Sequence, residues 1–158
     1  MTAVIAHCLA VIRRDVLLLD ANPDRVAVKA LFHDATEIFT GDMPTPIKYF
    51  DPEIISAYKR IESVASRKLL SALPSELHPA YQPVLVNEDD TEILLVRAAD
   101  KLAAYIKCIE EQKAGNPEFN RASEQTLKKL NDLKLREVDY FIEHFIPAFE
   151  LSLDDMNL

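Results

Sequence analysis

One short stretch of the sequence gathers an imidazole and three carboxylates. His33 and Asp34 are adjacent, Glu37 and Asp42 follow, and Gly41 lies between the last two. Side chains four residues apart on a helix share a face, and adjacent ones point about 100° apart, so such groups could converge on one ion. An imidazole with carboxylates suits Mn, Fe, Co, Zn or Mg. The alternative is a surface histidine among ordinary helix-end acids, although acids there oppose the helix dipole.

Asp100 is a further candidate because it interrupts an apolar segment. Its neighbours in that segment are small or apolar, namely Ala98, Ala99, Leu102, Ala103 and Ala104. Burying an ionised carboxylate is costly unless the carboxylate is paired or bound to a metal. Asp100 is therefore predicted either to bond within the core, with Arg97 or Lys101 as its partner, or to join His33 and Asp34 as a third metal ligand.

Helices must position these residues, because apolar side chains recur at spacings of three and four along most of the chain. The predicted helical segments are 2–19, 23–39, 52–73, a shorter piece after residue 74, 90–113, and one or two helices within 119–149. Asn22-Pro23 and Asp51-Pro52 each pair an N-cap with proline at the first helical position, and Gly41 suits a left-handed C-cap. The prediction is an all-α single domain over residues 1–158, with about six helices.

The composition limits the classes of function. The 158 residues carry a net charge of −8, with 49% hydrophobic residues and only two glycines. This balance is typical of a soluble globular domain and argues against an all-β fold rich in tight turns. No basic stripe is visible, so we expect no nucleic-acid polymer as a partner. We also expect no membrane span, because no apolar run is long enough.

The cysteines and the first residues bear on the cellular compartment. Cys8 and Cys108 are the only cysteines, and both lie in apolar helical patterns. Two buried free thiols are favoured over a disulfide. The apolar start lacks a preceding basic region, so no signal peptide is predicted. Together these features predict a cytoplasmic protein.

Two long runs resemble a known family. The run from Ala30 to Phe50 contains the His33-Asp34 pair, and the run from Arg97 to Glu111 contains Asp100. Both are similar to the HD-domain 5'-deoxynucleotidase family, often called YfbR-like. The tail from residue 137 to residue 154 matches as well, so the resemblance covers essentially the whole chain.

The resemblance implies an HD-domain helical bundle, a homodimer, and hydrolysis of deoxyribonucleoside 5'-monophosphates to deoxynucleoside and phosphate. It also implies a divalent metal ion (Co, Mn, Zn or Mg), with His33 and Asp34 matching the HD pair and Asp100 the distal aspartate. Glu37 and Asp42 match the family's catalytic acids. Asp42 and Lys48 are the expected substrate contacts, although Lys48 also fits an exposed loop lysine.

Relative to that family, we expect the sequence to lack part of the N-terminal segment. The family has a stretch before the position of Thr2 with the first ligand histidine, in a Glu-His-Ser context, and an Arg-Trp pair that contacts substrate. His7 lies roughly nine residues further along the same helix and is turned about 180° away, so it is not expected to replace that ligand. With three protein ligands, the chain as printed is expected to bind its metal weakly.

The expected reaction is metal-assisted hydrolysis of a phosphomonoester. In it, Glu37 positions or deprotonates the water, and Asp42 protonates the leaving 5'-oxygen or aligns the attack. Two alternatives stay open. One is a catalytically silent helical HD domain that dimerises or binds a nucleotide without cleaving it. The other is an HD phosphohydrolase that acts on a cyclic or longer nucleotide.

Overall fold

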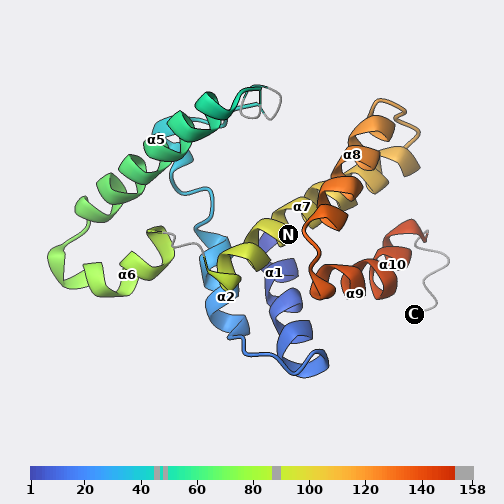
Figure 1. The fold of residues 1–158 in the computed structure, drawn as a ribbon, viewed down its shortest axis with the longest axis horizontal. Helices are drawn as coiled ribbons and strands as arrows, with labels where there is room; N and C mark the ends of the chain where they lie inside the picture. The colour runs from blue at the N-terminus through green and yellow to red at the C-terminus, as the bar shows by residue number, and fades with distance from the viewer. Residues whose placement is uncertain (45–46, 48–49, 87–89, 152–158) are drawn as a thin grey trace. The chain divides into compact units, whose positions relative to one another are not determined.

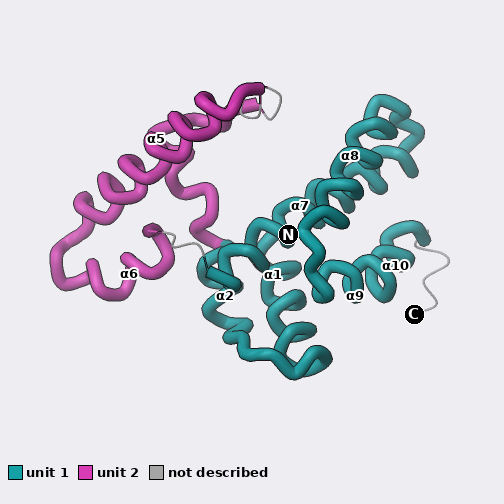
Figure 2. The backbone as a smooth tube through the Cα atoms, viewed as in Figure 1, with its two compact units in different colours: residues 1–30, 90–158 teal, residues 31–89 magenta. Residues whose placement is uncertain are grey.

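The structure is a computed structural model that describes residues 1–44, 47, 50–86 and 90–151. The regular structure of these residues is helical, with no strand among them (Figure 1). The chain divides into two compact units (Figure 2). Unit 1 comprises Met1–Ala30 and Asp90–Leu158, and unit 2 comprises Leu31–Asp89. The chain therefore leaves unit 1 once, after Ala30, and returns to it once, at Asp90.

Unit 1 is built around one long helix. Its helices are α1 (Thr2–Val11), α2 (Pro23–Leu31, which ends at the unit boundary), α7 (Thr91–Lys113), α8 (Phe119–Asp132), α9 (Arg136–His144) and α10 (Ile146–Glu150). A π-helical turn, Ile12–Val16, continues α1. Helix α7 contacts α1, α8 and α10, and α1 also contacts α9. The central position of α7 explains why ten of its side chains are buried.

The core of unit 1 is formed by apolar stripes on these helices. Leu9 of α1, Leu102 and Ile106 of α7, and Leu130 of α8 are completely removed from solvent and belong to one cluster. Burying a side chain of this size stabilises a fold by about 1.5–3 kcal/mol relative to leaving it exposed. This cluster is the main source of apolar stabilisation in unit 1.

Unit 2 holds fewer buried side chains. It comprises α3 (Glu37–Thr40), α5 (Pro52–Ser71), a 3₁₀ turn (Ser75–Leu77) and α6 (His78–Leu85). Helix α5 contacts both α3 and α6. The Phe32 ring packs edge-on against Tyr81, and Lys68 lies over the Phe39 ring at 4.9 Å from its centroid. Unit 2 is therefore organised along α5.

The helix starts at Pro23 and Pro52 follow the predicted caps. The Asn22 side chain accepts from the N–H of Arg25, and the Asp51 side chain accepts from the N–H of Glu53. Asp90 accepts from the N–H of Ile93 at 2.8 Å at the start of α7. Each cap satisfies an N–H group that has no partner inside its own helix. The predicted all-α class is confirmed for the residues that the structure describes.

The predicted helices are divided more finely than expected. The segment predicted as one helix over 23–39 forms α2 and the short α3, and the segment 119–149 forms α8, α9 and α10. Pro83 lies inside α6 without ending it. The part of the chain that the structure describes contains nine α-helices, compared with about six predicted.

The cysteines are free, as predicted. Cys108 is buried and Cys8 is partly buried. Burial raises the pKa of both thiols, which keeps them protonated and poorly reactive at neutral pH.

Within the described residues, no helix combines the length and the apolar character needed to cross a membrane.

Candidate active site

The His33-Asp34 pair lies in a tight turn between α2 and α3. Helix α2 ends at Leu31, and the bonds that follow join residues three apart: the N–H of Ala35 to the carbonyl of Phe32, and the N–H of Glu37 to the carbonyl of Asp34. Aspartate and threonine favour such departures, because their side chains compete for nearby backbone groups. The pair is thus held in a 3₁₀-like turn, and the expectation of a continuous helix through it is wrong.

The two side chains of the pair face one another. Nε2 of His33 lies 3.0 Å from Oδ2 of Asp34, with the histidine side chain 23% exposed and the aspartate side chain 60% exposed. Neighbouring ligands of an octahedral ion with bonds of about 2.1 Å are separated by roughly 3 Å. An imidazole and a carboxylate also form a donor set suited to Mn, Co or Zn. The pair therefore fits two adjacent positions of a divalent metal ion.

The two predicted catalytic acids bracket α3. Glu37 is its first residue and is partly buried, whereas Asp42 lies in the loop after it and is exposed. Gly41 ends α3 with the positive φ expected of this glycine, +66°, but its ψ of 169° lies outside the left-handed helical region, so the predicted left-handed C-cap is not formed. Its N–H donates to the carbonyl of Glu37 at 2.9 Å. One glycine thus connects the backbones of both acids.

Tyr58 contributes to this loop although the sequence analysis did not single it out. Its ring is buried in α5, with 4% exposure, and its hydroxyl donates to the carbonyl oxygen of Gly41 at 3.3 Å. The Thr40 hydroxyl donates to the same carbonyl at 2.9 Å. The only sequence signal was the position of a tyrosine on the buried side of a predicted helix, which does not reveal where its hydroxyl bonds.

Asp100 is exposed, and the expectation that it is a buried carboxylate is wrong. On α7 it shares a face with Arg97, Ala104 and Lys107, and all of these residues are exposed. Their spacings of three and four define one stripe of a helix, on the side away from Leu102. The argument from a buried charge therefore fails. The assignment of Asp100 as a metal ligand rests on the family resemblance and stays a prediction.

Each of the other three histidines, His7, His78 and His144, contacts a residue outside the His33-Asp34 pair. Nε2 of His7 lies 3.8 Å from Asp24 within unit 1, and Nε2 of His78 lies 3.0 Å from the carbonyl oxygen of Leu73 in unit 2. His144 packs on the ring of Tyr140.

Lys48, the predicted phosphate contact, lies outside the described residues. Within each unit taken alone, the described His, Cys, Asp and Glu side chains form no group of three placed to hold a metal. The proposed ligands divide between the units, because His33 and Asp34 belong to unit 2 and Asp100 to unit 1.

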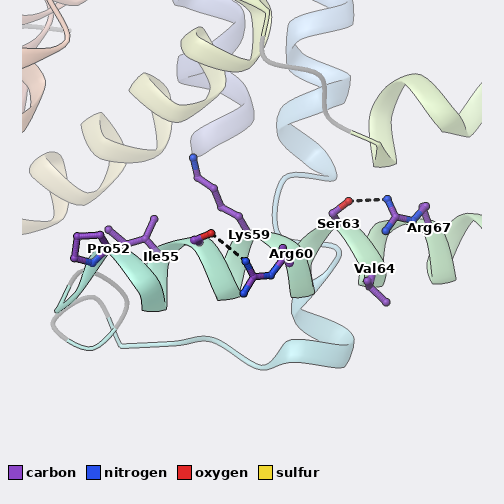
Figure 3. A pocket seen from close by; sticks show the side chains of 8 residues that line it. Pro52, Ile55, Lys59, Arg60, Ser63, Val64 and Arg67 are labelled. Atoms are coloured by element: carbon purple, nitrogen blue, oxygen red, sulfur yellow. Dashed lines mark hydrogen bonds between the residues drawn. The ribbon is translucent and has the colours of Figure 1, made fainter.

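A basic groove of about 620 Å³ runs along one face of α5 (Figure 3). Arg60 donates to Ser56 at 3.2 Å, and Arg67 donates to Ser63 at 2.8 Å, so the same pair recurs along the helix. Lys59 also lines the groove. None of the predicted site residues lines it, and we assign no chemistry to it.

A comparison with models of protein families identifies the family of this chain. The model of the family described as 5'-deoxynucleotidase YfbR-like matches residues 1–149, which include the His33-Asp34 turn, both acids and Asp100. The chain belongs to this family. The family resemblance predicted from the two motif runs is therefore confirmed.

Relatives of the same family are similar over nearly the whole chain. A protein of Photorhabdus laumondii named 5'-deoxynucleotidase is 45% identical over 158 residues, which cover 99% of this chain and 80% of the relative. A 5'-deoxynucleotidase of Vibrio cholerae is 44% identical over 157 residues, covering 98% of this chain and 81% of the relative. The chain is a phosphohydrolase, and a catalytically silent module is not favoured.

A solved structure supports the fold. An HD-domain phosphohydrolase from Listeria innocua superposes with a TM-score of 0.77 at 24% identity, covering 94% of this chain and 72% of that protein. At this level of identity the likeness bears on the fold alone. It agrees with the all-helical architecture seen here.

Proposed function

We propose that this YfbR-like phosphohydrolase removes the 5'-phosphate from deoxyribonucleoside 5'-monophosphates with the help of a divalent metal ion. The observation that carries the proposal is the family match over residues 1–149, which contains both motif runs. Relatives at about 45% identity bear the name 5'-deoxynucleotidase, which supports the substrate class.

His33, Asp34 and Asp100 are the proposed metal ligands. The 3.0 Å separation of the donor atoms of His33 and Asp34 supports their role as neighbouring ligands. A bound divalent ion supplies Lewis-acid polarisation of the phosphoryl oxygens and a water of lowered pKa. Because the family model spans both units, we treat them as one functional HD domain over residues 1–158.

Glu37 and Asp42 divide the proton transfers between them. Glu37, at the start of α3, orients the attacking water and accepts its proton. Asp42, in the loop after α3, contacts the substrate and either gives a proton to the leaving 5'-oxygen or aligns the attack. Their link through Gly41, whose N–H bonds to the Glu37 carbonyl, supports action on one substrate.

The proposal also includes a contact with the phosphate, an oligomeric state and a cellular compartment. Lys48 holds the phosphate as a point charge, as lysine does at many phosphate sites. The protein works as a homodimer, in keeping with what the family resemblance implies. Its two free cysteines suit a reducing cytoplasm, where we place the reaction.

The test is Glu37→Ala, assayed by phosphate release from 5'-dAMP with added Co²⁺ or Mn²⁺. We expect the rate to fall at least about 100-fold, because general acid–base groups contribute 10²–10⁴-fold. Metal content by elemental analysis and helicity by circular dichroism should stay unchanged. Glu53→Ala, which removes an exposed acid in the first turn of another helix of unit 2, is the matched control.

Two outcomes would contradict the proposal. Loss of metal in Glu37→Ala would make Glu37 a ligand instead of the residue that orients water. Equal rates for 5'-dAMP and 5'-AMP would show that the enzyme does not select deoxyribose, which would contradict the proposed substrate class.

A further inference from the structure

The Gly41 carbonyl is held from outside its own loop. Two hydroxyls donate to it, that of Thr40 at 2.9 Å and that of Tyr58 at 3.3 Å. A carbonyl oxygen has two lone pairs, so both bonds can form together. The Thr40 bond is local and moves with the loop. The Tyr58 bond comes from α5, a helix of twenty residues, and so fixes the loop relative to another element.

The peptide plane carries that constraint to Asp42. The carbonyl of Gly41, the N–H of Asp42 and the Cα of Asp42 lie in one plane, because the peptide bond does not rotate freely. Fixing the carbonyl direction therefore fixes where the Asp42 backbone begins. The N–H of Gly41 is also engaged, by the carbonyl of Glu37 at 2.9 Å. Both ends of Gly41 are thus tied, one to the position of Glu37 and the other to α5.

The burial of Tyr58 makes this hydroxyl more than a packing accident. The residue is 4% exposed, and a buried hydroxyl without a partner costs about 1–3 kcal/mol. A phenylalanine would fill the same space on α5 without needing a partner. A tyrosine at this position is therefore stabilised by the Gly41 carbonyl and restrains it in return.

We infer that Tyr58 is a positioning residue for Asp42, acting through the Gly41 carbonyl. The inference rests on the proposed function, in which Asp42 acts on the leaving 5'-oxygen. Tyr58 touches neither substrate nor metal in this assignment. Its effect is to keep the Asp42 backbone in one place relative to Glu37 during the reaction.

The two glycines of the sequence give a direct spectroscopic test. Protein labelled with ¹³C at the glycine carbonyl carries two such groups, Gly41 and Gly115. A Gly115→Asn variant assigns the two signals, since asparagine tolerates the left-handed φ of +82° at that position. Tyr58→Phe, which removes only the hydroxyl, should move the Gly41 signal and leave the Gly115 signal in place. An unmoved Gly41 signal would overturn the inference whatever the activity.

Kinetics test the connection to Asp42. Tyr58→Phe should lower kcat about 10-fold, as loss of an outer supporting bond commonly does, with KM and metal content unchanged. In an Asp42→Asn background, the same change should have no further effect on kcat. An equal fall in both backgrounds would show that Tyr58 acts independently of Asp42 and would overturn the inference. Tyr81→Phe, the same substitution elsewhere in unit 2, is the control and should leave kcat unchanged.

The proposed role of Asp42 and the positioning role of Tyr58 can fail separately. Full activity of Asp42→Asn would remove Asp42 from the proposed mechanism, and with it the catalytic meaning of the Tyr58 contact. A weakened Asp42→Asn together with a normal Tyr58→Phe would leave the proposed function intact and overturn the positioning role alone.

Discussion

Unit 1 and unit 2 bury apolar side chains to different extents. Every hydrophobic side chain that is completely removed from solvent among the described residues lies in unit 1, including Leu9, Leu95 and Leu130. The buried hydrophobic residues of unit 2 are Tyr58, Ala65, Val84 and Leu85, each with 4–8% exposure. Exposed apolar side chains do not distinguish the units, because Leu18 of unit 1 and Phe50 of unit 2 are both 82% exposed.

The candidate chemistry follows the opposite distribution. His33, Asp34, Glu37 and Asp42 all lie in unit 2, and none of them is fully buried. Functional residues are often carried by turns and loops that a better-packed scaffold supports. The difference indicates that unit 1 supplies most of the stability and unit 2 most of the reacting groups.

The largest expected effect comes from the core of unit 1. Leu102→Ala should lower the free energy of unfolding by about 3–5 kcal/mol, because the side chain is completely buried and its loss leaves a cavity. Leu85→Ala in unit 2 is the matched change, at 8% exposure, and should cost about 2 kcal/mol. Urea denaturation followed by circular dichroism measures both. Equal losses would break the distinction between the units.

An ion-pair cluster in unit 1 should give the next largest effect. Nζ of Lys29, whose side chain is 8% exposed, lies 2.9 Å from Asp90 and 2.8 Å from Glu92. Lys29→Met should cost about 2 kcal/mol, below the 3–5 kcal/mol typical of a broken buried pair. The smaller value follows because Asp90 is partly exposed and Glu92 keeps Arg25 as a partner. Adding Glu92→Gln should cost less in this variant than in the wild type, and additive losses would show that Lys29 and Glu92 are not coupled.

The pH dependence sharpens that prediction. Burial disfavours the charged form of Asp90, but bonds from Lys29 and the N–H of Ile93 outweigh it and hold the pKa of Asp90 below the ordinary 3.8. A lowered folded pKa gives stability that is present above the unfolded value and is lost as pH falls through the folded one. Wild-type protein should therefore lose stability as the pH falls below about 4, and Lys29→Met should lose less over the same range. Parallel curves for the two proteins would contradict this account.

The smallest expected effect lies at the start of α5 in unit 2. Asp51 accepts from the N–H of Glu53 at 2.6 Å, and removal of an N-cap costs about 1 kcal/mol. Asp51→Ala should cause a loss of that size and speed hydrogen exchange in the first turn of α5. A change confined to exchange, with no loss of global stability, would indicate that unit 2 unfolds separately from unit 1.

Local signals were read correctly from the sequence. The caps at Asn22 and Asp51, and the positive φ of Gly41, each depend on residues within one turn, so the sequence alone contains the needed information. The HD motif was also identified, because its residues are contiguous. The divalent ion's remaining ligand set and the oligomer stay predictions, since they depend on parts of the molecule beyond one unit.

Features set by tertiary structure were missed. Asp100 has apolar neighbours in sequence, yet it lies on the exposed face of α7 with Arg97 and Lys107. Lys29 is buried because the fold of unit 1 brings Asp90 and Glu92 to it, although the whole of unit 2 separates them from Lys29 in the sequence. The tertiary structure likewise brings the hydroxyl of Tyr58 to the carbonyl oxygen of Gly41. The sequence pattern indicates which residues share a face of a helix. It does not indicate which of those faces another element of the fold covers.

The order of the chain has a consequence during synthesis. Helix α1 packs on α7, but the whole of unit 2 lies between them in the sequence. A ribosome adds about 5–20 residues per second, so α1 waits roughly 5–20 seconds before α7 has been made. Throughout that interval the apolar face of α1, with Ile5 and Leu9, lacks its native partner. We expect the nascent α1 to stay accessible to ribosome-associated chaperones until α7 has been made.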